Sequence, residues 1–391
     1  MSQLARRQRF RLVPMRPRDP NEEGRSASSL ELFFDLVFVV AVSIASLELH
    51  HALTESHILD GLIAYAVVFF GIWWSWMNFT WFATSFATDD WLYRLLTFVQ
   101  MGGVLVFAAG IGPAFSDGNY TILVLSYVVM RVAMVAQWLR ASRLAGDSRR
   151  ATQLYAAGIG IVQLLWLLQL ALPAVLSAAA LIVLIVAELA VPIIAERTGG
   201  TTPWHPHHIT ERYGLFTLIL LGESLLASGN AIIEALHDNA ALGPLISISV
   251  LALVTTAALW WIYFWPPHHE SISSFGNSLR YGYVHYLVFA AAGALSAGVE
   301  VQIDVLTENT KLSTIAASFT FTAPVAAFVM GIWWIALRDN ADRLVNLVVP
   351  AGALLILADS LGPIPVTFTA AILVLIVIVL VLRDPVPASD K

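Results

Sequence analysis

The sequence predicts an all-α integral membrane protein that crosses the bilayer many times. Apolar runs of about 20 residues, the length that spans a bilayer as a helix, recur throughout the 391-residue chain. Only 12% of the residues are charged, whereas soluble domains contain about 25%, and the mean hydropathy is +0.75. The chain has no cysteine, which excludes disulfides, thiol nucleophiles and cysteine-ligated metals.

Apolar periodic segments bounded by charged, proline or glycine residues predict about twelve transmembrane helices. They cover residues 30–50, 58–82, 92–113, 119–140, 151–171, 174–195, 211–235, 244–266, 281–304, 313–337, 342–361 and 364–382.

The distribution of basic residues predicts the orientation. An even number of spans places both termini on one side, together with almost every arginine of the loops. Lys311 is the basic residue that falls in an opposite loop, and Arg131 is the one that falls inside a span. By the positive-inside rule, both termini are expected in the cytoplasm.

Two similar stretches indicate an internal repeat. "GIWWSW" at 71–76 resembles "ALWWIYFW" at 258–265, while Glu31 aligns with Glu211 and Arg94 with Arg280, at offsets of 180 and 186 residues. We therefore predict two six-helix halves of the same orientation. The expected organisation is a flexible basic cytoplasmic tail (1–27), a first repeat (28–195), a cytoplasmic linker (196–210), a second repeat (211–383) and a cytoplasmic tail (384–391).

Aromatic and histidine residues near predicted span ends are interpreted as interfacial. The tryptophans concerned are Trp73, Trp74, Trp76, Trp81, Trp260, Trp261, Trp265, Trp333 and Trp334. We read them as an aromatic belt rather than as a cage for a ligand. His268 and His269 in "WPPHHE" are expected to be solvated loop residues.

Two carboxylates open the first span, in "SSLELFFDLVFVV". Ser28 and Glu31 have the spacing of a capping box, which places Glu31 at a helix N-terminus. Asp35 lies one turn deeper, where capping does not explain it. It needs a partner on a neighbouring helix, and we predict Arg94.

A second polar cluster opens the seventh span, in "HPHHITERYG". His208 and Glu211 are spaced so that they could face one cavity and hold a metal. Pro206 interrupts the cluster and no second ligand pair is evident, so we expect no metal and no cofactor. We predict a hydrogen-bonded cytoplasmic mouth in which Arg280 and His285 bind Glu211. Its members are Glu31, Arg94, His208, Glu211, Arg212, Arg280 and His285.

Ionisable residues deep inside spans are the remaining candidates, because each is costly in lipid unless it is paired or hydrated. Glu223 and Arg131 are both expected near the midplane, where they could form an ion pair that Glu188 joins. In one reading the pair has a purely structural role and holds the two halves together. Alternatively, Glu223 is a protonatable or ion-binding carboxylate whose affinity Arg131 tunes. Asp35 is a further candidate for this path.

The runs "ELFFDLVFVVAV" (31–42) and "HHITERYGLFTLILLGESLLA" (207–227) resemble the low temperature requirement A (LtrA) family of bacterial membrane proteins. The matching residues are Glu31, Phe34, Asp35, His208, Glu211, Arg212, Gly214, Gly222, Glu223 and Ser224. The resemblance implies a multi-helix protein of the bacterial inner membrane and gives no substrate. The first run is also similar to a first-helix signature of six-span potassium channels, but Phe34 replaces its serine and the second half lacks it.

Two classes of function are weighed. The first is a transporter or channel-like protein that moves an ion or small solute, coupled to protonation of Glu223. The second is an intramembrane enzyme acting on a lipid or isoprenoid, with His208, Glu211 and Asp35 at the cytoplasmic interface. A structural or sensory membrane protein is a third reading. The expected partners are the lipid bilayer and the transported ion or solute, with a homodimer left open and no nucleic acid.

Overall fold

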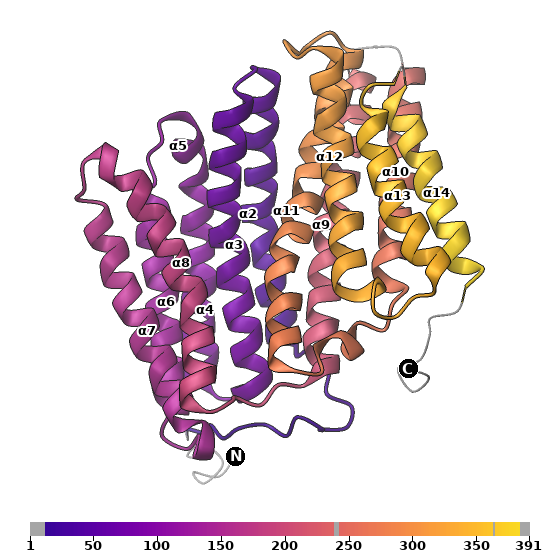
Figure 1. Cartoon of the computed structure of the whole chain (residues 1–391). Helices are drawn as coiled ribbons and strands as arrows, with labels where there is room; N and C mark the ends of the chain where they lie inside the picture. Colours follow the sequence, from indigo (N-terminus) through magenta and orange to yellow (C-terminus); the bar gives the residue numbers. More distant parts are fainter. Residues whose placement is uncertain (1–11, 238–241, 363, 384–391) are drawn as a thin grey trace, which may run out of the picture. The chain divides into compact units, whose positions relative to one another are not determined.

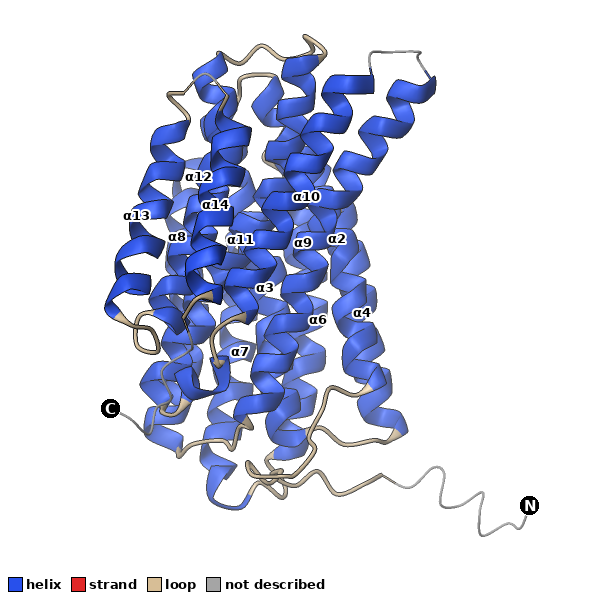
Figure 2. Cartoon of the chain, turned by 90° about the vertical axis from the view of Figure 1, so that its right-hand side faces the viewer, coloured by secondary structure: helices blue, strands red, loops and turns tan. Residues whose placement is uncertain are grey.

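The computed structural model describes residues 12–237, 242–362 and 364–383. Within these ranges the chain consists of helices and loops and contains no strand (Figure 2). The predicted all-α class is therefore confirmed.

The α-helices of the described residues are α2 (Ser29–Thr54), α3 (Ile58–Phe86), α4 (Trp91–Ala109), α5 (Ile111–Ser116), α6 (Thr121–Ala141), α7 (Arg149–Gln169), α8 (Ala174–Gly199), α9 (Pro206–His237), α10 (Leu242–Phe264), α11 (Phe275–Leu306), α12 (Thr314–Ile332), α13 (Arg343–Asp359) and α14 (Pro365–Val381). Short 3-10 helices lie at Gly146–Ser148 and His268–Ile272, and a π-helical turn at Trp333–Leu337 continues α12.

Each predicted span overlaps a helix, the span 92–113 overlaps both α4 and α5, and many of these helices can cross a membrane. Among the described residues, nine are long and apolar enough: α2, α3, α4, α6, α7, α8, α10, α11 and α12. Helices α13 and α14 have 17 residues each. The protein is thus a multi-pass membrane protein, and a total of twelve spans stays a prediction.

Several helices begin where the sequence supplies a capping side chain. The Asp90 carboxylate accepts a hydrogen bond from the Tyr93 N–H at the start of α4. Ser274, Ser313 and Asp342 do the same for α11, α12 and α13. These side chains satisfy N–H groups that have no partner within the helix.

The chain divides into two compact units. Unit 1 contains residues up to Ala41 together with Trp74–Glu211, and unit 2 contains Val42–Trp73 together with the residues from Arg212 onwards. Helices α2, α3 and α9 each contribute to both units. The predicted six-helix repeat is a pattern of the sequence and stays a prediction.

In unit 1, α4 packs on α6, α6 on α7 and α7 on α8 (Figure 1). The unit 1 part of α3 is buried on every side from Trp74 to Thr80. Because Trp73, Trp74 and Trp76 are at most 1% exposed, their interpretation as an interfacial belt is wrong. Exposed indoles that suit a belt do occur elsewhere, at Trp260, Trp261 and Trp334.

The N-terminal segment makes hydrogen bonds to other parts of unit 1. The Val13 N–H donates to Asp90 at 2.9 Å, and the Arg18 N–H donates to the Ser85 carbonyl at 2.9 Å. Residues 12–27 of the predicted tail are thus in contact with the rest of unit 1, residues 1–11 lie outside the described part, and the flexibility of the tail stays a prediction. The expected linker is also short, because α8 continues to Gly199 and α9 starts at Pro206.

In unit 2, α11 packs on α12, α12 on α13, and α14 on both α10 and α13. Helices α11 and α12 approach each other closely at Gly298, where an added Cβ would collide with the Thr320 carbonyl. The same interface is joined by the Gln302 amide, which donates to the Ala317 carbonyl at 2.6 Å.

Candidate functional site

Three side chains from three other helices of unit 1 meet at the carboxylate of Glu188 in α8. The Trp74 indole N–H of α3 and the Arg131 Nη2 of α6 donate to its Oε2 at 2.9 and 3.0 Å. The Gln163 amide of α7 donates to its Oε1 at 2.7 Å. We call these four residues the Glu188 centre.

The Glu188 centre is enclosed and lies deep in the helices. Glu188 is 0% and Arg131 2% exposed. Arg131 is the middle residue of α6, which runs from Thr121 to Ala141, so it lies about 15 Å from either end at 1.5 Å per residue. A single charge at that depth costs about 2.5–3.5 kcal/mol on insertion scales. The opposite charge and the hydrogen bonds offset this penalty.

The hydrogen bonding of the centre is incomplete among the described residues. The Arg131 Nε and the Gln163 Oε1 are buried and have no hydrogen-bond partner there. Arg131 also lies over the Tyr127 ring, 5.7 Å from its centroid. A donor and an acceptor thus remain available beside a buried ion pair.

The predicted pairing of Arg131 with Glu223 is wrong, because the ion pair of Arg131 is formed with Glu188. Glu188 lies seven residues before the predicted end of its span at 195. It lies deeper because α8 continues for eleven residues beyond it, to Gly199. Glu223 lies in the unit 2 part of α9, is half-buried, and its carbonyl accepts from the Ser296 hydroxyl at 3.4 Å.

The capping box at the start of α2 is confirmed. Both the N–H and the hydroxyl of Ser28 donate to Glu31 Oε2 at 2.7 Å, and the Glu31 N–H donates to the Ser28 hydroxyl at 3.3 Å. The other carboxylate oxygen faces His208 Nε2 at 3.2 Å and Arg25 at 3.8 Å. Two members of the predicted mouth, Glu31 and His208, are thus in contact.

The predicted pair of Asp35 with Arg94 is wrong. Asp35 is buried, and its Oδ1 accepts from the Trp76 indole N–H at 2.7 Å. Arg94 is half-exposed and pairs with Asp89 at 2.6 Å. The reason is local, since Asp89 lies in the loop just before α4 and reaches Arg94 along its own chain.

The predicted partners of Glu211 are also wrong. The Glu211 carboxylate accepts from the Ala27 N–H at 3.2 Å. Arg280 pairs with Asp339 at 3.0 Å, and His285 hydrogen bonds to tyrosines. Arg212, another member of the predicted mouth, is fully buried in unit 2.

Unit 2 contains a buried Tyr–His network of Tyr263, His268, Tyr281 and His285. The Tyr281 carbonyl lies 2.7 Å from His285 Nδ1, which therefore carries the proton, and His285 Nε2 accepts from the Tyr263 hydroxyl at 3.2 Å. The Tyr263 carbonyl lies 2.6 Å from His268 Nε2, and His268 Nδ1 accepts from the Tyr281 hydroxyl at 3.1 Å. Both histidines are thus held neutral.

His268 is not the solvated loop residue that the sequence suggested. It is 8% exposed, and burial lowers its pKa to about 4, against the bond to the Tyr263 carbonyl, which raises it. The sequence "WPPHH" gave no sign of this, because the burial depends on the side chains of α10 and α11.

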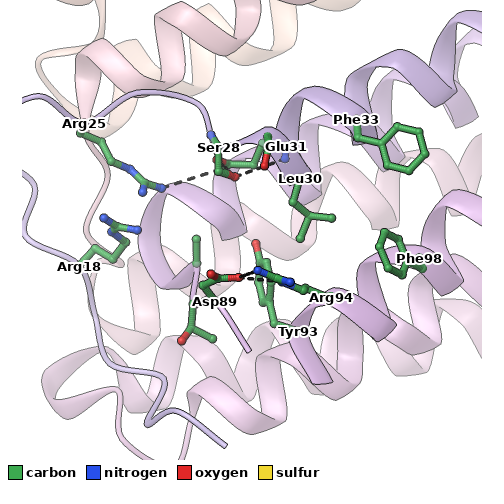
Figure 3. Close-up of a pocket in the computed structure, with 13 residues that line it drawn as sticks. Arg18, Arg25, Ser28, Leu30, Glu31, Phe33, Asp89, Tyr93, Arg94 and Phe98 are labelled. Carbon is green, nitrogen blue, oxygen red and sulfur yellow. Dashed lines mark hydrogen bonds and ion pairs between the residues drawn. The ribbon is translucent and has the colours of Figure 1, made fainter. Parts of the chain in front are cut away.

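The N-terminal segment and the starts of α2 and α4 form a pocket of about 650 Å³ in unit 1 (Figure 3). We call it the arginine pocket. It is lined by Arg18, Arg25, Ser28, Ser29, Leu30, Glu31, Phe33, Ala87, Thr88, Asp89, Tyr93, Arg94 and Phe98.

Charged groups around the arginine pocket lie outside the spans and have shifted affinities for protons. Burial lowers the pKa of Arg25, against the nearby Glu31 carboxylate. The Arg18 hydrogen bond lowers the pKa of Glu22. Burial opposes ionisation of Asp90, but hydrogen bonds from Arg140 and from the Tyr93 and Val13 N–H groups outweigh it and lower the pKa of Asp90.

Sequence reasoning missed Trp74, Trp76 and Gln163 as partners of the buried carboxylates. A usable signal was present for the tryptophans. Trp74 lies eight residues inside the predicted end of its span at 82, or about 12 Å, which is deeper than an interfacial belt. Gln163 carries no such signal, because one amide in an apolar run has many interpretations.

Residues 26–382 match the family described as "Bacterial low temperature requirement A protein (LtrA)". The chain belongs to the LtrA family. It is also similar to an uncharacterized protein of Rhizobium meliloti (strain 1021), RA0937, with 31% identity over 257 residues, which are 63% of this chain and 60% of that protein. The chain thus spans about 60% of the length of this relative, and the similarity to LtrA proteins carries no stated substrate.

Proposed function

We propose that this LtrA-family protein moves an ion or small solute across the bacterial inner membrane, coupled to protonation of a carboxylate inside the membrane. The observation that carries the proposal is the buried Arg131–Glu188 pair, which has unpartnered polar atoms beside it. Ionisable residues in such positions are by default candidates for ion or proton pathways.

The geometry supports coupling between a proton and a second charge. When Glu188 is ionised, Arg131 is neutralised at 3.0 Å. When Glu188 takes up a proton, the centre keeps the positive charge of Arg131, which attracts an anion and repels a cation. Binding of an ion beside Arg131 therefore changes the proton affinity of Glu188. This mutual effect is the thermodynamic requirement for coupled transport.

A purely structural role was the main alternative, in which the ion pair ties the two predicted halves together. Both Arg131 and Glu188 belong to unit 1 and to the first predicted half. The pair therefore links helices α6 and α8 within one unit.

Glu223 and Asp35 remain further proposed positions on the path. The distribution of arginines supports the proposal that both termini are cytoplasmic.

Proton flux into liposomes with a trapped pH dye tests the proposal, with a potassium diffusion potential as the driving force. The double variant R131Q/E188Q removes both charges and keeps amide hydrogen-bonding groups, so it should fold but show no pH-dependent flux. Glu223→Gln, measured in parallel, asks whether the second carboxylate is also required.

The matched control is Asp60→Asn, which removes an exposed carboxylate at the start of α3. Its flux should equal that of the wild type. Unchanged pH-dependent flux in R131Q/E188Q would reject the role of Glu188. Equal loss in D60N would show that the loss does not come from the Glu188 centre.

A further inference from the structure

We propose that the arginine pocket binds the headgroup of an anionic phospholipid, whose acyl chain lies along Phe33 and Phe98. The pocket has a positively charged end and an apolar end, as such a lipid does (Figure 3). None of its residues belongs to the Glu188 centre, so the inference does not depend on the proposed transport.

The charged end presents three guanidinium groups, from Arg18, Arg25 and Arg94. The first turn of α2 lines the same space, and the N–H groups of Ser29 and Leu30 have no partner within the helix. A helix N-terminus carries partial positive charge. Guanidinium and N–H groups together are the donors that bind phosphate oxygens.

The guanidinium group of Arg25 has a hydrogen-bond donor without an acceptor. Its side chain is 7% exposed, and its Nε is buried without a hydrogen-bond partner among the described residues. Its Nη2 donates to the Ala83 carbonyl at 3.3 Å and lies 3.8 Å from Glu31, beyond hydrogen-bond distance. Arg25 lines the pocket, so a phosphate there would lie beside a guanidinium group that still lacks an acceptor, and an unpartnered buried donor is unfavourable.

The carboxylates of the pocket are already engaged. Glu31 accepts from Ser28 and faces His208, and Asp89 is paired with Arg94. Of the arginines, Arg18 is paired with Glu22 and Arg94 with Asp89, so Arg25 is the one whose guanidinium group lacks a carboxylate within hydrogen-bond distance among the described residues. The helix N-terminus adds further positive potential, so the pocket favours an anion.

The apolar end favours a lipid over a soluble anion. Phe33 of α2 and Phe98 of α4 are 49% and 47% exposed. Their rings are arranged edge to face, with 6.5 Å between the ring centroids. Leu36 and Leu95, three residues along each helix, are also exposed. This apolar surface runs from the arginines along two membrane helices, where an acyl chain would lie.

Native mass spectrometry of the purified full-length protein in neutral detergent tests the site. Phosphatidylglycerol should bind, and phosphatidylcholine with the same acyl chains should bind at least about tenfold more weakly. Arg25→Gln should weaken phosphatidylglycerol binding about tenfold, as expected for the loss of a charged hydrogen bond. Arg94→Gln should weaken it about fivefold, and because Arg94 is half-exposed this variant keeps the fold.

The matched control is Arg16→Gln, which removes an exposed arginine of the same segment outside the pocket. It should bind phosphatidylglycerol as the wild type does. Equal losses in R16Q and R25Q would overturn the site, because they would reflect only diffuse attraction by the basic segment. Equal binding of phosphatidylcholine would overturn it as well.

Phe98→Ala and soluble glycerol phosphate separate the two sources of a phosphate group. With a lipid site, F98A weakens phosphatidylglycerol binding, and glycerol phosphate competes poorly. If glycerol phosphate binds as tightly as the lipid and F98A has no effect, the occupant is a soluble anion and the lipid proposal is wrong.

Discussion

The Glu188 centre of unit 1 and the Tyr–His network of unit 2 both bury polar side chains, but the first contains charged groups and the second neutral ones. Each buries four polar side chains contributed by several segments of a membrane protein. The Glu188 centre joins two full charges, Arg131 and Glu188, at 3.0 Å. The Tyr–His network contains only neutral groups, in which backbone carbonyls fix the tautomers of both histidines.

The difference indicates which region is able to change state. In the Tyr–His network each ring nitrogen of the two histidines already has a hydrogen-bond partner, so protonating a histidine requires a tyrosine hydroxyl to turn from donor to acceptor. The Glu188 centre has a donor and an acceptor without partners among the described residues. The proposed coupling to a proton therefore rests on the Glu188 centre, and we interpret the Tyr–His network as structural.

The largest expected effect comes from removing one charge of the Glu188 centre. Glu188→Gln leaves Arg131 buried without an opposite charge and should lower the free energy of unfolding by about 3–5 kcal/mol. The double variant R131Q/E188Q should recover most of this loss. Thermal unfolding in detergent measures both, and equal stability of the single and double variants would contradict the charge argument.

The next effect concerns pH and the neutral network. The pKa of folded His268 is about 4, below the value of about 6.5 in an unfolded chain. As pH falls, the unfolded state binds the proton first. The stability is fully present above about pH 6.5 and decreases by about 3 kcal/mol towards pH 4.

His268→Gln keeps a donor for the Tyr263 carbonyl and cannot titrate. Unfolding temperatures of wild type and H268Q, compared between pH 7 and pH 4, should show a flatter dependence for the variant. The same slope in both proteins would mean that His268 is not held neutral.

A smaller effect tests whether unit 2 depends on close packing. Gly298→Ala would drive a Cβ into the Thr320 carbonyl, a backbone atom that cannot move aside easily. Such overpacking should lower stability by about 1–3 kcal/mol. Gly276→Ala, in the same helix, meets nothing within 4 Å and should leave the unfolding temperature nearly unchanged.

The smallest effect is expected at the capping box of unit 1. Ser28→Ala removes the hydroxyl that bonds to Glu31 and its N–H, and should lower stability by about 1 kcal/mol. Ser29→Ala, one residue further, is the control because its side chain makes no such bond in the described structure. A loss in S28A as large as that in E188Q would contradict the ranking of the two regions.

Local sequence signals predicted the features that depend on neighbouring residues. The Ser28–Glu31 capping box follows from a spacing of three, and the apolar segments coincide with helices. The failures have a common cause. Asp35, Glu211 and Arg131 were each assigned partners by depth alone, and depth does not determine which helix lies alongside or which side chain faces inward.

The tryptophans illustrate the same limit. By their position near a predicted span end, Trp74 and Trp76 resemble residues of an interfacial aromatic belt. In the folded chain their stretch of α3 is surrounded by protein, so their indole N–H groups are directed to Glu188 and Asp35. Burial on every side is a property of the assembled helices and leaves no periodic pattern in an already apolar segment.

By itself, the sequence determined that this is an all-α, multi-pass membrane protein of the LtrA family, because hydropathy and the two signature runs are local properties of the chain. It also placed costly charges inside the spans, which singled out Glu223 and Arg131 as candidates, with Glu188 and Asp35 as further ones. Only the tertiary structure decided that these two residues pair with each other, that two tryptophans bind the buried carboxylates, and that three arginines line one pocket. The physical reason is that helix neighbours are selected by packing over the whole chain, whereas a residue's depth in the membrane is determined by its position along one helix.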